Sequence, residues 1–184
     1  MNAPPVLEIE DLKFEILISE KDLQNRLREL AGQISRDYDG EVPIMIGVLN
    51  GAVLFMADLI RYLSIDCEMD FIKISSYGNK RVSSGEITMV KDFSADLHSR
   101  HVIVVEDIVD SGLSAQYLKR RVQSMKPASV KFVSLLTKTD SLKVDVDIDY
   151  VGFEIDNKFV VGYGLDYKQQ KRNVNAIYQL VQGS

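Results

Sequence analysis

The stretch HVIVVEDIVDSGLSA, residues 101–115, combines an apolar run with three carboxylates and a loop of small residues. Glu106 and Asp107 are adjacent, and Asp110 follows after two apolar residues. Paired carboxylates can accept hydrogen bonds from the vicinal hydroxyls of a ribose, and they can hold water on Mg²⁺, which prefers oxygen ligands. A third carboxylate at the mouth of the loop could stabilise positive charge or move a proton.

The small residues of this stretch, Ser111 to Ser114, precede a helical pattern over residues 113–125. The first backbone N–H groups of a helix are free, and together with the helix dipole they make a phosphate site. Gly112 would let the chain approach the ligand, while the hydroxyls of Ser111 and Ser114 add donors. The loop is not a P-loop, because it lacks the second glycine and the GK[ST] sequence.

Short apolar runs alternate with amphipathic segments along the chain, and these elements must position the loop. Helices are predicted from Ser19 to Tyr38, with Ser19 and Asp22 as the N-cap pair, and over residues 52–63 and 113–125. Strands are predicted over residues 43–49, 67–75, 87–90, 102–105, 129–136, 150–153 and 159–161. Strands that are apolar throughout and alternate with helices indicate an α/β fold, with a mainly parallel sheet covered on both faces. Ligands bind at the C-terminal ends of such strands.

Composition narrows the classes of function. The 184 residues suffice for one domain, and the net charge of −5 argues against a general attraction for nucleic acid or anionic membranes. The single cysteine rules out an intramolecular disulfide, and no segment has the apolar length of a membrane span. The stretch MNAPPVLEIED is acidic and lacks an apolar signal core, so we expect a cytoplasmic protein.

The 101–115 stretch resembles the signature of the type I phosphoribosyltransferases, which bind 5-phosphoribosyl 1-pyrophosphate. Three further stretches resemble the hypoxanthine-guanine phosphoribosyltransferases, and the resemblance runs from about Ile9 to Gln179: VLNGAVLFMADL (48–59), SLLTK (134–138) and VGFEIDNKFVVGYGLDY (151–167). It implies a twisted sheet flanked by helices, with a small hood subdomain built from the chain ends. Residues 1–184 would form one domain, with a core over about 36–148 and a hood over about 6–20 and 149–184.

The resemblance assigns roles around the sugar phosphate and the purine. The phosphoribosyl group would be bound by Glu106, Asp107, Asp110, Ser111, Gly112, Leu113 and Ser114. Asp110 would be the catalytic residue. The purine contacts would be Ile108 covering one face, Phe159 stacked on the other, Lys138 on the 6-oxo group, Val160 through its backbone, and Asp166. Mg²⁺ would be held by Glu106, Asp107 and Asp166. Taken singly, Phe159 and Val160 could be strand core, Asp166 a turn residue, and Lys138 and Arg172 solvated surface charges.

Two more segments match the family. Leu49, Asn50 and Gly51 correspond to its pyrophosphate loop, with a cis Leu49–Asn50 peptide, and Arg172 would contact the pyrophosphate. Many relatives carry Lys or Arg where this chain has Asn50, but binding through the backbone should survive that change. Ser76 and Tyr77 begin a polar segment, residues 76–86, whose composition indicates a mobile loop that would close over the reacting centre.

The implied activity is purine salvage, in which hypoxanthine, or guanine, reacts with 5-phosphoribosyl 1-pyrophosphate to give IMP, or GMP, and pyrophosphate. Two alternatives stay open: a transferase that prefers xanthine and guanine, and a non-catalytic regulator that binds the phosphoribosyl compound. A homodimer or homotetramer is expected, with the helix that begins at Ala52 as an interface. No nucleic-acid or membrane partner is expected.

Overall fold

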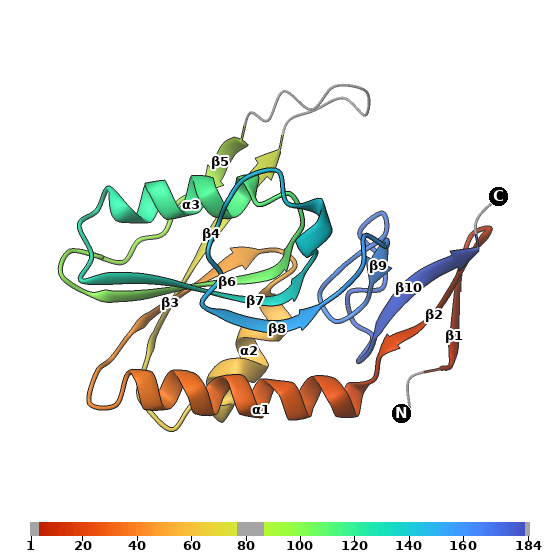
Figure 1. Cartoon of the computed structure of the whole chain (residues 1–184), viewed down its shortest axis with the longest axis horizontal. Helices are drawn as coiled ribbons and strands as arrows, with labels where there is room; N and C mark the ends of the chain where they lie inside the picture. The colour runs from red at the N-terminus through yellow and green to blue at the C-terminus, as the bar shows by residue number, and fades with distance from the viewer. Residues whose placement is uncertain (1–3, 77–86, 183–184) are drawn as a thin grey trace.

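A six-stranded sheet forms the centre of the molecule in the computed structural model, which describes residues 4–76 and 87–182 (Figure 1). Its strand order is β5-β4-β3-β6-β7-β8, and all neighbours are parallel except β4 and β5. The strands are β3 (Ile44–Leu49), β4 (Glu68–Ser76), β5 (Ile87–Lys91), β6 (His101–Val109), β7 (Ser129–Thr137) and β8 (Tyr150–Glu154). The predicted α/β fold with a mainly parallel sheet is therefore confirmed.

Helices cover both faces of this sheet (Figure 1): α1 (Glu20–Asp37) and α2 (Val53–Tyr62) lie on one face, and α3 (Leu113–Gln123) lies on the other. Alternate residues of β6 reach opposite faces, because successive side chains of a strand point in opposite directions. Ile103 and Val105 pack in the core with α1 and α2, whereas Val102 and Val104 pack in the core with α3. This two-sided burial explains why the strands read as continuous apolar runs.

The N-cap of α1 forms as the sequence predicts, since the Ser19 hydroxyl accepts a hydrogen bond from the Asp22 backbone N–H at 3.2 Å. A short 3₁₀ helix, η1 (Thr139–Ser141), follows β7. Within the described residues, no helix combines the length and apolar character that crossing a membrane requires.

The predicted end of one strand is wrong. β6 does not stop at Val105 but continues to Val109, so Glu106 and Asp107 lie within the strand. The ladder to β7 continues beyond the apolar run, because Glu106 pairs with Ser134 and Val109 pairs with Thr137. Backbone pairing with the neighbouring strand, which the side-chain pattern does not report, thus carries the acids into the sheet.

A second sheet, of order β1-β2-β10-β9, is built from the two ends of the chain: β1 (Val6–Ile9), β2 (Leu12–Ile18), β9 (Val160–Val161) and β10 (Ile177–Gln182). Of these strands, only the segment of β9 was predicted. The sheet has a core of its own, made by Leu7, Ile9, Phe14, Val161, Ala176 and Tyr178. The division into core and hood stays a prediction, and β8 pairs with β7 in the larger sheet.

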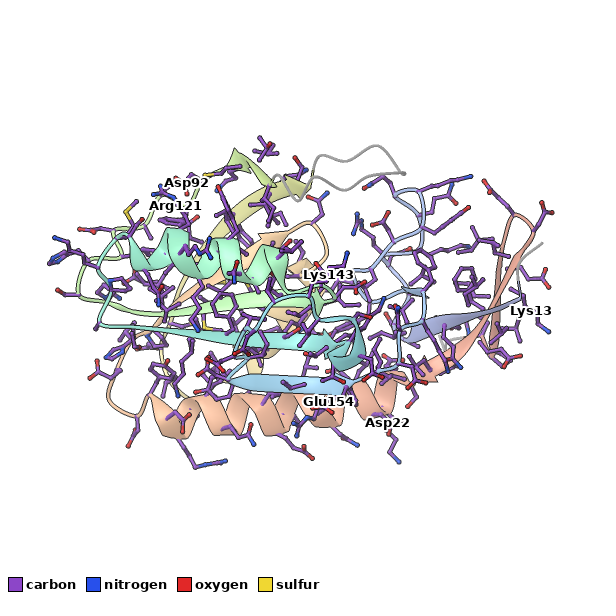
Figure 2. All side chains as sticks on the ribbon, turned by 45° about the horizontal axis from the view of Figure 1, so that its top comes forward. Lys13, Asp22, Asp92, Arg121, Lys143 and Glu154 are labelled. Carbon is purple, nitrogen blue, oxygen red and sulfur yellow. The ribbon has the colours of Figure 1, made fainter. Side chains whose placement is uncertain are left out.

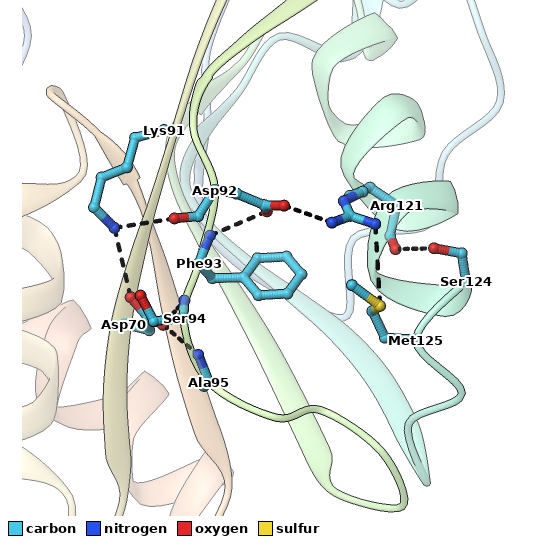
Figure 3. Close-up of polar contacts among 9 residues, drawn as sticks. All are labelled: Asp70, Lys91, Asp92, Phe93, Ser94, Ala95, Arg121, Ser124 and Met125. Atoms are coloured by element: carbon cyan, nitrogen blue, oxygen red, sulfur yellow. Dashed lines mark hydrogen bonds and ion pairs between the residues drawn. The ribbon is translucent and has the colours of Figure 1, made fainter.

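A cluster of polar contacts holds the segment after β5, residues 92–95, in place. Arg121 of α3 donates to the Asp92 carboxylate at 2.5 Å, and Figure 2 shows these two side chains together beside α3. Asp70 of β4 accepts hydrogen bonds from the backbone N–H groups of Ser94 and Ala95 (Figure 3). The cluster ties the chain after β5 to both the sheet and α3, on the face of the sheet that α3 covers.

Candidate functional site

The candidate site lies where β3, β6 and β7 end, because the loops after these parallel strands emerge at the same edge of the sheet (Figure 1). Leu49 is the last residue of β3, and Asn50 and Gly51 follow it. Asp110–Gly112 follows β6, and Lys138 follows β7. A fourth segment, residues 162–166, reaches this edge from β9 of the smaller sheet. The predicted residues thus gather from segments far apart in the sequence.

The loop after β6 encloses a pocket of about 310 Å³, counting its open mouth. Its lining residues are Glu106, Ile108, Val109, Asp110, Ser111, Gly112, Ser114 and Ala115. Gly112 sits at the start of α3 in the left-handed conformation, with φ of 78°, and no side chain caps the helix there. The first N–H groups of α3 are therefore left for a ligand, as a phosphate site requires. Of the residues predicted for the phosphoribosyl group, Asp107 and Leu113 are not part of this lining.

Glu106 is deeply buried, with 4% of its surface exposed, yet it lines the pocket. Its Oε1 atom has no hydrogen-bond partner among the described residues. Burial raises the pKa of this carboxyl well above its ordinary value, and the neighbouring Asp107 charge raises it further. A buried acceptor without a partner is costly, so Glu106 is suited to a hydroxyl or a hydrated cation that arrives with the ligand.

Asp107 lies against the loop after β3. Burial raises the pKa of its carboxyl to about 6, and the nearby Asp166 charge acts in the same direction. Backbone N–H groups of Asp107 and Ile108, and the Arg172 guanidinium, oppose that rise. The net effect at both acids is a raised pKa, so their ionised forms are only partly compensated in the free protein, and a bound cation would supply the rest.

The pH dependence of stability should report this arrangement. Because the folded state raises the pKa of Asp107 above its unfolded value, folding favours the protonated carboxyl, and stability falls as pH rises from about 4 to 6. In EDTA we expect Asp107→Asn to raise the free energy of unfolding by about 1–2 kcal/mol at pH 8, with no gain at pH 4. Urea denaturation at both pH values measures it. An equal change at both would contradict the assignment.

Asp110 and Lys138 form an ion pair at the mouth of the pocket, with Lys138 Nζ donating to Asp110 Oδ2 at 3.0 Å. Lys138 is 7% exposed, so the alternative reading of a solvated surface charge is wrong for it. Its backbone N–H also donates to the Val109 carbonyl at 2.9 Å. Asp110 itself is exposed. A carboxylate and an ammonium group are thus held together beside the phosphate loop.

The residues predicted for the purine differ in exposure. Phe159 is 46% exposed, so its ring is not strand core, and it lies 6.3 Å from the Phe14 ring and 6.0 Å from the Tyr167 ring. Val160 is 6% exposed and belongs to the core that α1 and α2 cover, so its side chain is strand core, as the alternative reading had it. Ile108 lines the pocket at the start of α3.

Three segments meet at Gly51. The Leu49–Asn50 peptide is cis, as expected, and a Cβ atom at Gly51 would collide with the Asp107 carboxylate. A Cβ atom at Gly164, whose φ is 99°, would collide with the Gly51 carbonyl oxygen. The predicted pyrophosphate loop is therefore packed between β6 and the 162–166 segment. Sequence reasoning missed Gly164, although two glycines around one residue in VVGYGLDY are a signal of close backbone approach.

Asp166 and Arg172 are paired, with Arg172 Nη2 at 2.5 Å from Asp166 Oδ1. Arg172 also donates to the Gly164 carbonyl at 2.6 Å, and Asp166 accepts from the Gln169 backbone N–H at 2.7 Å. Asp166 is thus more than a turn residue, and Arg172 is not a solvated surface charge. Ser76 ends β4 opposite Ile87, whereas Tyr77 lies outside the described residues.

Glu106 and Asp107 are suited to a magnesium ion that binds chiefly through the phosphates of the substrate. Across residues 4–76 and 87–182, no three His, Cys, Asp or Glu side chains form a group able to hold a metal. Mg²⁺ is commonly bound through one or two carboxylates together with substrate phosphates. The unpartnered Glu106 oxygen and the adjacent Asp107 carboxyl satisfy that requirement.

Comparison with known proteins places this geometry in a family. The phosphoribosyl transferase domain family matches residues 19–168. The hypoxanthine-guanine phosphoribosyltransferase of Bacillus subtilis is 45% identical over 160 residues, which cover 87% of this chain and 89% of that protein. The enzyme of the same name from Mycobacterium tuberculosis is 43% identical over 173 residues, which cover 91% and 85% of the two chains.

Solved structures of proteins with the same names resemble this chain in fold. A crystal structure of a hypoxanthine-guanine phosphoribosyltransferase from Bacillus anthracis, with HEPES in its active site, has a TM-score of 0.87 at 45% identity. The match covers 91% of this chain and 98% of that one. The hypoxanthine phosphoribosyltransferase of Trypanosoma cruzi has a TM-score of 0.87 at 38% identity, covering 95% and 94%, and was solved to study how its C-terminal region affects oligomeric state and activity.

Proposed function

Because the chain belongs to the phosphoribosyl transferase family, among the hypoxanthine-guanine phosphoribosyltransferases, we propose that it joins a 6-oxopurine to a phosphoribosyl group. The substrates are hypoxanthine or guanine and 5-phosphoribosyl 1-pyrophosphate, and the products are IMP or GMP and pyrophosphate. The observation that carries this proposal is the Asp110–Lys138 pair beside the pocket at the start of α3. It brings a proton acceptor and a base-reading cation to the phosphate site.

The reaction forms a bond from the purine N9 to C1 of the ribose, while the bond from C1 to the pyrophosphate oxygen breaks. The first N–H groups of α3, with Ser111 and Ser114, hold the 5-phosphate. Glu106 and Asp107 accept from the ribose hydroxyls. Asp110 faces N7 and takes or shares the proton that the base loses, because general acid–base groups act within hydrogen-bond reach. The electron pair of the broken bond leaves with pyrophosphate.

Charge on the leaving group is stabilised at the junction of the three segments that meet at Gly51. Backbone N–H groups of Leu49–Gly51 and the Arg172 side chain bind the pyrophosphate, beside the Asp166 carboxylate that is paired with Arg172. Mg²⁺ would be held chiefly by the substrate phosphates, with carboxylates from Glu106, Asp107 and Asp166, which within the described residues do not form a metal-holding group by themselves, and it would supply charge neutralisation. Asn50 in the loop contributes its backbone and carries no charge of its own.

Base selection follows from Lys138. An ammonium group is only a donor, so it favours the 6-oxo oxygen over the 6-amino group of adenine, while Phe159 and Ile108 enclose the ring. The preference among hypoxanthine, guanine and xanthine rests on contacts to the substituent at C2, near Val160 and Asp166. We further propose that the loop beginning at Ser76 and Tyr77 closes over the reacting centre. The protein would be a homodimer or homotetramer located in the cytoplasm.

A comparison of four bases tests the proposal. With 5-phosphoribosyl 1-pyrophosphate and Mg²⁺, we expect nucleotide formation from hypoxanthine and guanine, with adenine at least about 10³-fold poorer in kcat/KM. EDTA in excess should abolish the reaction. Higher kcat/KM for xanthine than for hypoxanthine would favour the xanthine-preferring alternative. Binding of the phosphoribosyl compound without consumption of any base would favour the regulator.

A further inference from the structure

Tyr163 is a buried tyrosine that the proposed chemistry does not use. It is 4% exposed, and its hydroxyl donates to Asp58 Oδ2 of α2 at 2.5 Å. The same carboxylate oxygen accepts from Gln24 Nε2 of α1 at 3.0 Å. Burial raises the pKa of the Tyr163 hydroxyl, and the Asp58 charge raises it further, so the phenol stays a neutral donor. Tyr163 is thus bonded to α2 directly, and to α1 through the Asp58 carboxylate that Gln24 also donates to.

The backbone around Tyr163 is unusual. Gly162, Tyr163 and Gly164 have φ values of 101°, 48° and 99°, three left-handed residues in succession. A residue with a Cβ atom in that region costs free energy and persists only where its surroundings hold it. The Tyr163 N–H donates to the Val174 carbonyl at 2.9 Å, and its hydroxyl contact to Asp58 provides a second anchor.

Asp58 and Tyr163, the two partners of this hydrogen bond, each belong to a segment that adjoins the Leu49–Gly51 loop. Asp58 lies on α2, which begins at Val53, with only Ala52 between it and Leu49–Gly51. Gly164, next to Tyr163, packs so closely on Gly51 that no Cβ atom fits between them. The Leu49–Gly51 loop and the 162–166 segment are therefore connected at two places. Gly51 contacts Gly164 directly, and α2, which follows the loop, is bonded to Tyr163 through Asp58.

We propose that Tyr163 is a positioning residue, whose bond to Asp58 sets the separation between the 162–166 segment and the Leu49–Gly51 loop. It acts through Gly164 on Gly51, and it holds Asp166 and Arg172 at the distance that pyrophosphate requires. The inference rests on the proposed function and goes beyond it, because it gives a task to a group that touches no substrate. Without the hydroxyl bond, the turn can withdraw from Gly51, and the pyrophosphate site widens.

Tyr163→Phe tests the proposal against a matched control. Tyr150 is also buried, and its hydroxyl donates to Asp37 Oδ2 at 2.6 Å, at the end of α1 away from the site. We expect Tyr163→Phe to raise KM for 5-phosphoribosyl 1-pyrophosphate, and for pyrophosphate in the reverse reaction, by about fivefold to tenfold. Tyr150→Phe should lower Tm by a similar amount and leave both KM values unchanged.

Variants of Asp58 complete the design. Asp58→Ala should reproduce the KM increase, and Asp58→Asn, which retains an acceptor oxygen, should restore KM to near the wild-type value. The double variant Tyr163→Phe/Asp58→Ala should be no worse than Asp58→Ala alone, because the two residues act through one bond.

Two failures are distinguishable. Wild-type protein that forms no nucleotide would refute the proposed function. Active wild-type protein together with a Tyr163→Phe variant that loses Tm but keeps both KM values would overturn the positioning role alone. Fully multiplicative effects in the double variant would likewise overturn it, because they would place the two residues on independent routes.

Discussion

Replacing Asp110 by asparagine is expected to lower kcat by about 10²–10⁴-fold, while KM for 5-phosphoribosyl 1-pyrophosphate changes by about threefold at most. Asparagine keeps an acceptor oxygen for Lys138 Nζ, so the local hydrogen bond of 3.0 Å can persist. It cannot accept a proton from the base at working pH. An interaction needed only as the proton leaves lowers kcat without weakening ground-state binding.

Steady-state kinetics with hypoxanthine, and a direct binding measurement for the phosphoribosyl compound, check this expectation. Asp39→Asn is the matched control, because Asp39 is exposed in the turn after α1, at the opposite edge of the sheet. Equal losses in kcat and in affinity for the phosphoribosyl compound would remove Asp110 from its role as proton acceptor and make it a ligand contact.

Replacing Lys138 by glutamine is expected to lower kcat/KM for hypoxanthine by about 10²-fold or more and to reduce the preference for hypoxanthine over adenine. The ammonium group can only donate, so a 6-amino group leaves it without an acceptor. Glutamine carries both a donor and an acceptor, and its side chain can turn its oxygen toward adenine. The ratio of the two kcat/KM values is therefore the informative quantity.

The ratio of kcat/KM for hypoxanthine to kcat/KM for adenine also distinguishes two roles of Lys138, which are recognition of the base and the ion pair with Asp110. Losing the Lys138 charge leaves Asp110 without its partner, which should affect every base to a similar extent. Lys126→Gln is the control, since Lys126 is exposed in the turn between α3 and β7, at the other end of the strands. If the ratio stays constant while both rates fall, Lys138 supports Asp110 but does not select the base.

Features that depend on neighbours in the chain were predictable. The Ser19 cap forms because its donor is three residues away. The phosphate loop follows from a strand, a glycine and a helix start that are contiguous in sequence. The parallel sheet follows from apolar runs that alternate with helices. The partners in the cap and in the loop lie within one element or in two consecutive elements, whereas the order of strands in the sheet, with β3 beside β6, does not follow from such local pairs.

The prediction failed where distant backbone decides the outcome. The end of β6 was placed four residues early, because its pairing with β7 continues after the side chains turn acidic. β1, β2 and β10 were not predicted: β1 and β2 form a hairpin at one end of the chain, and the pairing of β2 with β10 joins that hairpin to the other end. No local pattern reports a hydrogen-bond partner that lies at the other terminus.

By itself, the sequence determined which chemical groups are available: the acids of residues 106–110, the small residues of the phosphate loop, Lys138, and the aromatic ring of Phe159. Only the tertiary structure decided which of them meet. It pairs Lys138 with Asp110, leaves an oxygen of Glu106 unpartnered among the described residues, and packs Gly164 on Gly51. The physical reason is that side-chain chemistry is a property of each residue, whereas a distance between loops is set by how the sheet and helices pack.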